Sequence, residues 1–439
     1  MTTNDLETAE IVRRLSHAGA ADKTVDGVSR RYFMKLIGAG GLGAASVVLG
    51  SRFAYVKEAF AGAPIAANDR ILINLVLYGG NDGLNMVVPK TNSLYYQQRP
   101  SIAIAPEATL SLSADYGLHP GLPFLKQLWD AGHMAIVQGV GYPNPDLSHF
   151  SSMATWMAGK YGTGGATSGW LGRWLDTLPA ATSELALLTL GYTAPLHLLG
   201  NTRRGLAVPE DQEMFGSGTE GQDLRMYEGL KALSSVPGGR GTLQDLYANM
   251  LKAELGAAND VKAVWASALP EGPLTKKMVA AARIINANVG ARVIDVSLDG
   301  FDTHEGQPAR HGELMTELNA AVSAFYTELA SEWHGRVAIV SMSEFGRTNF
   351  DNDSEGTDHG TVGPMLVIGH GVKGGFKGEA SSLAVADRWS RMTYTTDFRR
   401  VLGTVLDDWL GGDGVAVLGG SYSKLDLFTS PTTGGGVVV

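Results

Sequence analysis

The 439-residue sequence contains no cysteine. Disulfide bonds and thiolate metal ligands are therefore unavailable to this chain. Any bound metal ion must be held by oxygen atoms and imidazole nitrogens, a set that suits zinc, manganese, magnesium or calcium. The absence of cysteine thus restricts the kinds of metal site that the sequence can build.

Long hydrophobic runs are also absent. The apolar stretch at residues 36–50 covers 15 residues, many of them glycine or alanine, whereas a membrane-spanning helix needs about 20 predominantly apolar residues. No later segment is long and apolar enough to cross a membrane. The sequence therefore predicts no transmembrane segment in the mature protein.

Positive charge is scarce as well. The 35 basic residues are outnumbered by 44 acidic ones, which gives a formal net charge of −9. An acidic surface repels phosphate backbones and anionic lipid headgroups. We therefore expect neither nucleic acid nor anionic membranes as partners.

The N-terminal region has the pattern of a twin-arginine export signal. Residues 29–35 read SRRYFMK, the short apolar stretch follows, and Ala59-Phe60-Ala61 places small residues where a signal peptidase cuts. The alternative, a chance arginine pair ahead of a transmembrane helix, is disfavoured because the stretch is short and glycine-rich. We expect residues 1–61 to be a signal peptide, which a signal peptidase removes after the twin-arginine translocase has exported the folded protein to the periplasm or beyond.

Cleavage after Ala61 leaves 378 residues. Residues 1–61 carry eight of the basic and six of the acidic residues, so the mature chain has 27 against 38, a net charge of −11. This length suits one large α/β domain, expected over residues 62–430. Within it, residues 205–289 are polar and turn-rich at first and then helical, which indicates a helical insertion. The Gly/Thr/Val-rich tail, 431–439, is expected to be disordered.

Five short, nearly continuous apolar runs each lead into a polar loop, as strands covered on both faces do. The predicted strands are 71–78, 134–138, 292–298, 336–342 and 364–369. Amphipathic helices are predicted at 122–131 and 311–333. Strands alternating with helices indicate an α/β fold with a doubly wound, mostly parallel sheet.

The polar loops after these strands contain side chains capable of metal binding or catalysis. In an open α/β sheet, ligands bind beyond the carboxyl ends of the strands, so these groups could converge. They are Asp82, Ser148, His149, Asp302, His304, Glu344, Asp358 and His359. Four carboxylates, three imidazoles and a hydroxyl would make a chemically sensible metal site.

Some of these residues also have structural interpretations. Asp82 stands in a Gly-Gly-Asn-Asp-Gly turn, and Ser148 could be a helix N-cap. The pair Asp302 and His304 is more specific, because two ligand-type side chains one residue apart in a loop can face one ion. Asp358-His359, between glycines, also favours a site. Glu344 is interpreted as a ligand, a neighbour of the ligands or an ion-pair partner of Arg347.

Nine motifs, taken together, resemble the bacterial domain-of-unknown-function family 1501. They span residues 71–418 and read GGNDGLNMVVP, YYQQRPSIAI, GLHPGL, SHF with Trp156, GWLGRWLD, SLDGFDTH, MSEFGRT, GTDHG and GVKGG. Members of that family typically carry a twin-arginine signal, in agreement with Arg30 and Arg31. The family has no established general reaction.

That family is in turn similar to the alkaline phosphatase and sulfatase superfamily. The similarity implies an alkaline phosphatase-like sheet, with Ser148 as nucleophile. From their positions in the polar loops, His149, Glu344 and Arg347 are predicted as supporting residues around the ligands. The implied metal ligands are Asp82, Asp302, His304, Asp358 and His359. Two features depart from that pattern: Asp302 and His304 are only one residue apart, and no obvious final histidine follows Asp358-His359.

Two functions follow as hypotheses. The first is an exported metal-dependent hydrolase of phosphate or sulfate esters, in which Ser148 attacks the ester and water removes the product from the enzyme. The second is a catalytically inactive, metal-stabilised protein that binds or assembles an envelope component, because a shared fold does not carry an activity with it.

Overall fold

The computed structural model describes residues 64–161, 166–179, 182–191, 193–208, 228–229, 231–235, 248–249, 252, 264 and 267–430. The predicted signal peptide (1–61), much of the predicted insertion (205–289) and the predicted disordered tail (431–439) lie outside these residues. Within the described part of the chain, no helix has the length and apolar character needed to cross a membrane.

Strand β1 (Ile71–Tyr78) lies in the interior of the main sheet and is covered on both faces. Ile71, Ile73 and Leu75 pack into one hydrophobic cluster, whereas Leu72 and Val76 pack into a second cluster on the opposite face. Successive strand side chains point to opposite faces, so an unbroken apolar run is what a doubly covered strand requires. The residue pattern of β1 thus defines a three-layer arrangement.

In the described part of the chain, the main sheet has nine strands in the order β11-β5-β10-β9-β1-β8-β6-β7, with β12 paired to β5. β1 runs parallel to β8 and β9, whereas β10 is antiparallel to both β9 and β5. The bounds are β5 Met134–Gly141, β6 Leu187–Leu190, β7 Leu206–Val208, β8 Val293–Asp299, β9 Val337–Met342, β10 Gly363–Ile368, β11 Gly375–Lys377 and β12 Thr396–Asp397. A small sheet contains β2 (Val87–Val88), β4 (Gly117–Leu118) and β3 (Leu110–Ser111).

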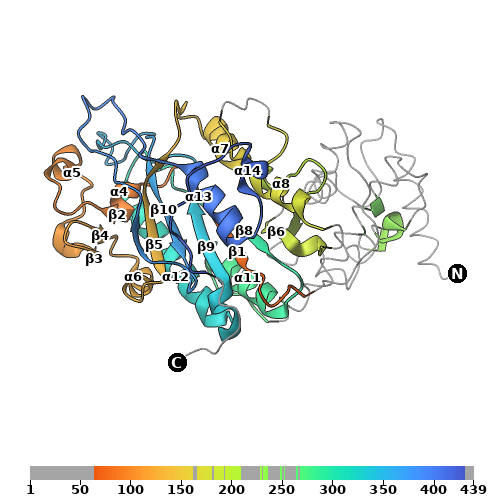
Figure 1. The fold of residues 1–439 in the computed structure, drawn as a ribbon. Coiled ribbons are helices and arrows are strands. Elements are labelled where there is room, and N and C mark those ends of the chain that lie inside the picture. The colour runs from red at the N-terminus through yellow and green to blue at the C-terminus, as the bar shows by residue number, and fades with distance from the viewer. Residues whose placement is uncertain are drawn as a thin grey trace, which may run out of the picture.

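Helices cover both faces of the main sheet (Figure 1). One cluster joins the sheet to α6 (Pro123–Asp130), α11 (Thr275–Ala287) and α12 (Gln307–Glu328). The other joins it to α7 (His149–Ala158), α8 (Trp170–Thr177), α13 (Phe398–Thr404) and α14 (Gly414–Leu418). The short helices α4 (Gly83–Met86) and α5 (Ser93–Gln98) lie near the small sheet. The prediction of an α/β fold with a mostly parallel, doubly covered sheet is confirmed.

The remaining helical turns are short. They are η1 (Pro106–Ala108), η2 (Glu184–Ala186), η3 (Leu196–Leu198), η5 (Ser331–Arg336) and the π-helical turn η6 (Val405–Trp409).

All five predicted strands are present, within a few residues at their ends. Strands β6 and β7 were not predicted, because runs of four and three residues are too short to give a clear periodicity. Both ends of the segment predicted as an insertion belong to the main domain: β7 extends the sheet, and α11 packs against α12 in the core.

The strand directions bring several loops to one edge of the sheet. β1, β5, β8 and β9 all point the same way, since β5 and β9 are each antiparallel to β10. Their carboxyl ends therefore share an edge, and the segment that enters β10 begins at that edge too. Ligands of α/β sheets bind at such an edge, and the candidate site lies there.

Candidate metal centre

Four side chains from three of these loops converge at the carboxyl edge of the sheet. His149 begins α7 after β5, Asp302 and His304 follow β8, and His359 precedes β10. Of the described residues, His149, Asp302 and His359 form the group suited to holding a metal ion, with one ligand atom from each lying within 4.8 Å of the others. We refer to His149, Asp302, His304 and His359 as the candidate centre.

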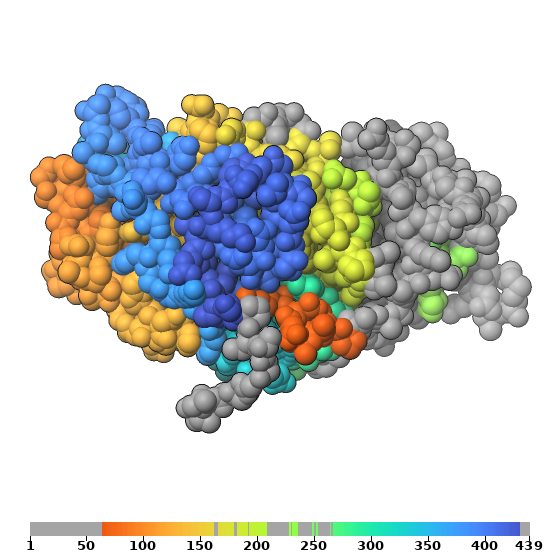
Figure 2. Space-filling view, viewed as in Figure 1, coloured from red at the N-terminus to blue at the C-terminus, as the bar shows by residue number. Residues whose placement is uncertain are grey.

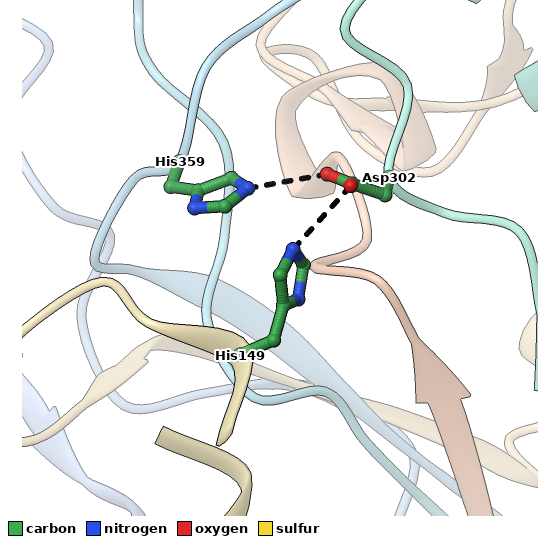
Figure 3. Close-up of side chains that lie close together, drawn as sticks. All are labelled: His149, Asp302 and His359. Carbon is green, nitrogen blue, oxygen red and sulfur yellow. Dashed lines mark hydrogen bonds and ion pairs between the residues drawn. The ribbon is translucent and has the colours of Figure 1, made fainter. Parts of the chain in front are cut away.

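The imidazole Nε2 atoms surround the Asp302 carboxylate. Nε2 of His149 lies 3.4 Å from Oδ2, and Nε2 of His359 lies 3.1 Å from Oδ1 (Figure 3). The Nε2 atom of His304 is 3.0 Å from Asp302 Oδ1 and 3.0 Å from His359 Nε2. Ligand atoms around a tetrahedral zinc ion lie about 3.3 Å apart, given bonds of about 2.0–2.1 Å. The observed spacings are of that size.

The other ring nitrogen of each histidine faces a hydrogen-bond acceptor. His149 Nδ1 lies 2.9 Å from Glu344 Oε1, His304 Nδ1 3.2 Å from Asp358 Oδ1, and His359 Nδ1 2.8 Å from the Leu147 carbonyl oxygen. Carbonyl and ionised carboxylate oxygens only accept, so each Nδ1 is assigned the proton, which it donates. In the neutral rings, Nε2 then carries a lone pair directed into the centre, as in metal-binding histidines with an oriented outer partner.

Such an arrangement of lone pairs favours a cation. Nε2 of His149 is buried and has no hydrogen-bond partner in the described part of the chain. Arg347 supplies one positive charge here, with Nη2 at Asp302 Oδ1 and Nη1 3.5 Å from His304 Nε2. It leaves His149 Nε2 unsatisfied, and an unsatisfied buried nitrogen is unfavourable. The residues therefore fit a divalent ion, and nitrogen-rich ligation suits zinc better than the oxygen-preferring manganese, magnesium and calcium.

The protonation states also match those of metal ligands. Partial burial would raise the pKa of Asp302, but the hydrogen bond and charge of Arg347, together with His359 and His304, lower it to about 2. Burial lowers the pKa of His359 below its usual value. At neutral pH, Asp302 is ionised and His359 is neutral, which are the forms that bind metal ions.

The buried guanidinium of Arg347 holds the loops of the centre together. Its Nε donates to the Gly80 carbonyl oxygen at 2.7 Å, and Nη1 donates to that of Thr357 at 3.0 Å. Nη2 donates to the carbonyl oxygens of Gly79 and Phe301 and, at 2.7 Å, to Asp302 Oδ1. Arg347, predicted as a supporting residue, thus connects the loop after β1 with the loops that carry Asp302 and His359.

Glu344 orients the imidazole ring of His149 through its carboxylate. Its side chain is only 3% exposed, and its carboxylate accepts the backbone N–H groups of Gly79 and Gly80 at 2.9 and 3.1 Å as well as the His149 Nδ1 proton. Gly79 has φ of +116°, and a Cβ there would lie 2.4 Å from the Asp302 nitrogen. Glycine is therefore required at 79 for this close approach of the loops.

Ser148 lies at the N-cap of α7, beside the centre. The position agrees with the capping interpretation, but the side chain makes no capping hydrogen bond. The segment that leads to it is strained: Asn144 has φ of +52° and Leu147 of +60°, values that non-glycine residues rarely adopt. The Leu147 carbonyl is the acceptor for His359 Nδ1. One peptide unit thus connects the predicted nucleophile to a histidine of the centre.

The structure does not bring Asp82 into the candidate centre. Asp82 caps α4 and is 1% exposed, and its carboxylate binds Arg99 Nη1 at 2.6 Å and also accepts from Gln307 Nε2. Burial opposes its ionisation, but the charge and hydrogen bond of Arg99 outweigh this effect and hold the pKa of Asp82 below its usual value. Arg99 was noted in the sequence only within a motif, because no spacing rule pairs it with Asp82.

Two further residues make contacts other than those predicted for them. His149, predicted as a supporting residue, directs Nε2 into the centre, whereas Asp358, predicted as a ligand, contacts Nδ1 of His304. Leu147 and Gln307 were not predicted at all. A backbone carbonyl leaves no signal in the sequence, and the bonds of Gln307 to Asp82, Thr303 and Thr357 depend on tertiary contacts.

Residues 131–400 match a family described as "Protein of unknown function (DUF1501)". The chain belongs to this family. The match covers more than half of the sequence and confirms the resemblance indicated by the motifs. None of the curated proteins matches the chain.

Two solved structures are similar to the chain at low sequence identity. One is Ps i-CgsB in complex with k-i-k-neocarrahexaose, with 11% identity over 81% of this chain and 73% of that chain and a TM-score of 0.34. The other, from Bacteroides thetaiotaomicron VPI-5482 and described as a candidate sulfatase, has 12% identity over 81% of this chain and 76% of that chain and a TM-score of 0.29. At TM-scores below 0.5, neither similarity establishes a property of this chain.

The different positions of Asp82 and the candidate centre predict different effects of substitution. Asp82→Asn is expected to lower the free energy of unfolding by about 3 kcal/mol, because Arg99 would remain buried without a countercharge, while metal content stays unchanged. Urea unfolding and elemental analysis measure the two effects. Asp130→Asn, in the exposed pair with Lys126, is the control and should cost less than about 1 kcal/mol. Loss of metal from Asp82→Asn at unchanged stability would contradict this assignment.

Glu344→Gln is expected to weaken metal binding by about 10- to 100-fold, because it disturbs the group that orients His149 Nδ1. Competition with a chelator measures the affinity. The matched control is Glu328→Gln, which removes the carboxylate paired with Arg283 at 2.9 Å near the end of α12 and should leave the affinity unchanged. Equal affinities of the two variants would show that Glu344 does not support the centre.

Proposed function

We propose that this chain is an exported, metal-dependent hydrolase of phosphate or sulfate esters. The observation that carries the proposal is the convergence of three imidazole Nε2 atoms on the Asp302 carboxylate. Ser148, directly before His149, accompanies them, and its hydroxyl is not used as a helix cap. A nucleophile beside a nitrogen-rich metal site is a combination that supports ester hydrolysis.

A divalent ion at this position would act as a Lewis acid, lowering the pKa of a nearby hydroxyl or water and stabilising negative charge on the ester. His149, His304, His359 and Asp302 would hold it, and their outer partners would fix the ring orientations. The three histidines and the carboxylate provide one net negative charge, so the loaded centre keeps a positive charge that attracts an anionic ester.

Ser148 would perform the covalent step. Its Oγ attacks phosphorus or sulfur, the bond to the leaving alcohol breaks, and the alcohol takes up a proton. Water then cleaves the serine ester, which releases phosphate or sulfate and restores the hydroxyl. The partial positive charge at the N-terminus of α7 stabilises the developing negative charge on Oγ. Leu147, directly before Ser148, has a left-handed backbone of the kind that is common at functional sites.

A second candidate is an inactive metal-stabilised protein that binds or assembles an envelope component. Ser148 Oγ has no hydrogen bond to a base in the described ranges of the chain, and a hydroxyl without an activating group is a weak nucleophile. In this candidate the centre stabilises the loops, and the ligand binds without being cleaved.

Ser148→Ala separates the two candidates. In the hydrolase, the variant is expected to lose turnover of aryl phosphate, phosphodiester or sulfate substrates to background level while its metal content stays unchanged. Ser151→Ala, on the exposed side of α7, is the matched control and should keep its activity. Full activity of Ser148→Ala would eliminate Ser148 as nucleophile, and a parent protein with metal but no turnover would support the binding protein.

Export is tested on the full-length precursor. Replacement of Arg30 and Arg31 by lysine is expected to leave the precursor in the cytoplasm, because the export receptor reads the arginine pair and lysine lacks the guanidinium geometry. Fractionation followed by immunoblotting gives the distribution. The same replacement of Arg13 and Arg14 is the control and should not affect export. Continued export of the Arg30/Arg31 variant would contradict the twin-arginine assignment.

A further inference from the structure

Two large aromatic side chains project into solvent beside the candidate centre. Phe150 is 91% exposed and Trp389 is 74% exposed, compared with 52% for Val415 and 43% for Tyr161, the other exposed large hydrophobic residues of the described chain. Single exposed apolar residues are common on protein surfaces. Here, however, Phe150 directly follows His149, and Trp389 lies in a turn that Arg391 connects to the backbone of His359.

Phe150 follows His149 in the first turn of α7. Successive helix residues point about 100° apart, so His149 can reach Asp302 while the phenyl ring of Phe150 faces solvent at the rim. The rings of His149 and His359 are 4.4 Å apart between centroids. Phe150 therefore directly follows, in the sequence, a histidine whose ring lies against a second histidine of the centre.

Trp389 belongs to a turn whose backbone is held by hydrogen bonds. The carboxylate oxygen Oδ1 of Asp387 accepts the backbone N–H groups of Trp389 and Ser390 at 2.9 and 2.8 Å, and also the Ser390 hydroxyl. Arg391 connects this turn to the centre, since it donates through Nη1 to the Trp389 carbonyl oxygen and through Nε to that of His359, both at 2.7 Å. The backbone that carries the exposed indole is thus held by hydrogen bonds before any ligand binds, which reduces the entropy lost on binding.

The turn at residues 387–391 carries one net positive charge, because Arg388 and Arg391 outnumber Asp387, whereas the whole chain carries a net charge of −9. The Arg388 guanidinium lies 5.5 Å from the centre of the indole ring, and Arg391 is two residues along the chain from Trp389. The segment around residue 150 (gold) and the segment 380–395 (blue) both project from the upper face of the molecule in Figure 2. The rim therefore combines aromatic rings with guanidinium groups, which suits an anionic ligand.

The type of ligand follows from the exposure of the rings. A ring that stands in solvent covers only one face of its ligand, so the other faces must remain compatible with water. A sugar ring meets this condition: its C–H groups pack on the electron-rich aromatic face, while its hydroxyl groups stay hydrated. A lipid chain would instead need an enclosing apolar wall.

We propose that Phe150 and Trp389 bind the sugar rings of an anionic carbohydrate chain and thereby present its ester groups to the candidate centre. The inference rests on the proposed function and names its substrate class. Arg388 contacts the negative substituents of the chain, and two aromatic rings on separate segments favour a polymer over a single small ester.

Binding is measured by calorimetry with the metal-loaded mature chain carrying Ser148→Ala, so that no turnover occurs. The probes are dextran sulfate, neutral dextran, ATP and vesicles of phosphatidylglycerol and phosphatidylcholine. We expect dextran sulfate to bind in preference to the other three. Adding Phe150→Ala or Trp389→Ala should weaken this binding by about tenfold each. The control Val415→Ala removes an exposed side chain of α14 and should leave the affinity unchanged.

Unchanged binding of dextran sulfate by both aromatic variants would overturn the proposal, because attraction to guanidinium groups alone would then suffice. Preferential binding of vesicles or of ATP would also overturn it, in favour of a membrane or a nucleotide. Failure of the proposed function is seen separately, in the metal content and aryl-ester turnover of the chain with Ser148 intact. Aromatic-dependent carbohydrate binding without any turnover would reject the hydrolase and retain the carbohydrate subsite.

Discussion

The candidate centre depends on a buried positive charge, the guanidinium of Arg347. A buried guanidinium is strongly unfavourable unless its N–H groups are satisfied, and here they bind carbonyl oxygens of Gly79, Gly80, Phe301 and Thr357 and the Asp302 carboxylate. These acceptors belong to three loops that are far apart in the sequence. Separation of any loop would leave part of the charge unpaired, so the loops that carry Asp302, His304 and His359 are held in register by the protein itself.

A second layer of buried charge lies beneath the same edge of the sheet. The Asp82–Arg99 pair is almost fully buried, and Gln307 connects it to Thr303 and Thr357, which neighbour the residues of the centre. On the other side, the Glu344 carboxylate binds backbone N–H groups and the His149 ring. The metal-binding atoms of the centre are thus supported by the hydrogen-bonded side chains beneath them. Support of this kind keeps ligand geometry fixed.

The segment 144–147 connects Ser148, the predicted nucleophile, to the hydrogen-bonded loops of the centre, and its backbone is locally strained. Left-handed backbone at Asn144 and Leu147 is unfavourable, and such conformations persist where the surrounding structure enforces them, commonly at functional sites. The hydrogen bond from His359 Nδ1 to the Leu147 carbonyl is one such constraint. Position of the serine and orientation of the histidine are therefore coupled, which a plain helix cap would not require.

The residue pattern predicted much of the fold, because a strand covered on both faces must be apolar at every position, as at 71–78. The motifs identified the family, and the loops after strands identified His304, His359 and Asp302 as neighbours. The sequence could not assign roles among Asp82, His149 and Asp358. Those roles depend on which buried cation lies nearest to each carboxylate and on which ring nitrogen faces a fixed acceptor. Only tertiary structure decides this, since Arg99 reaches Asp82, and Arg347, Glu344 and the Leu147 carbonyl reach the residues of the centre, from other segments of the chain.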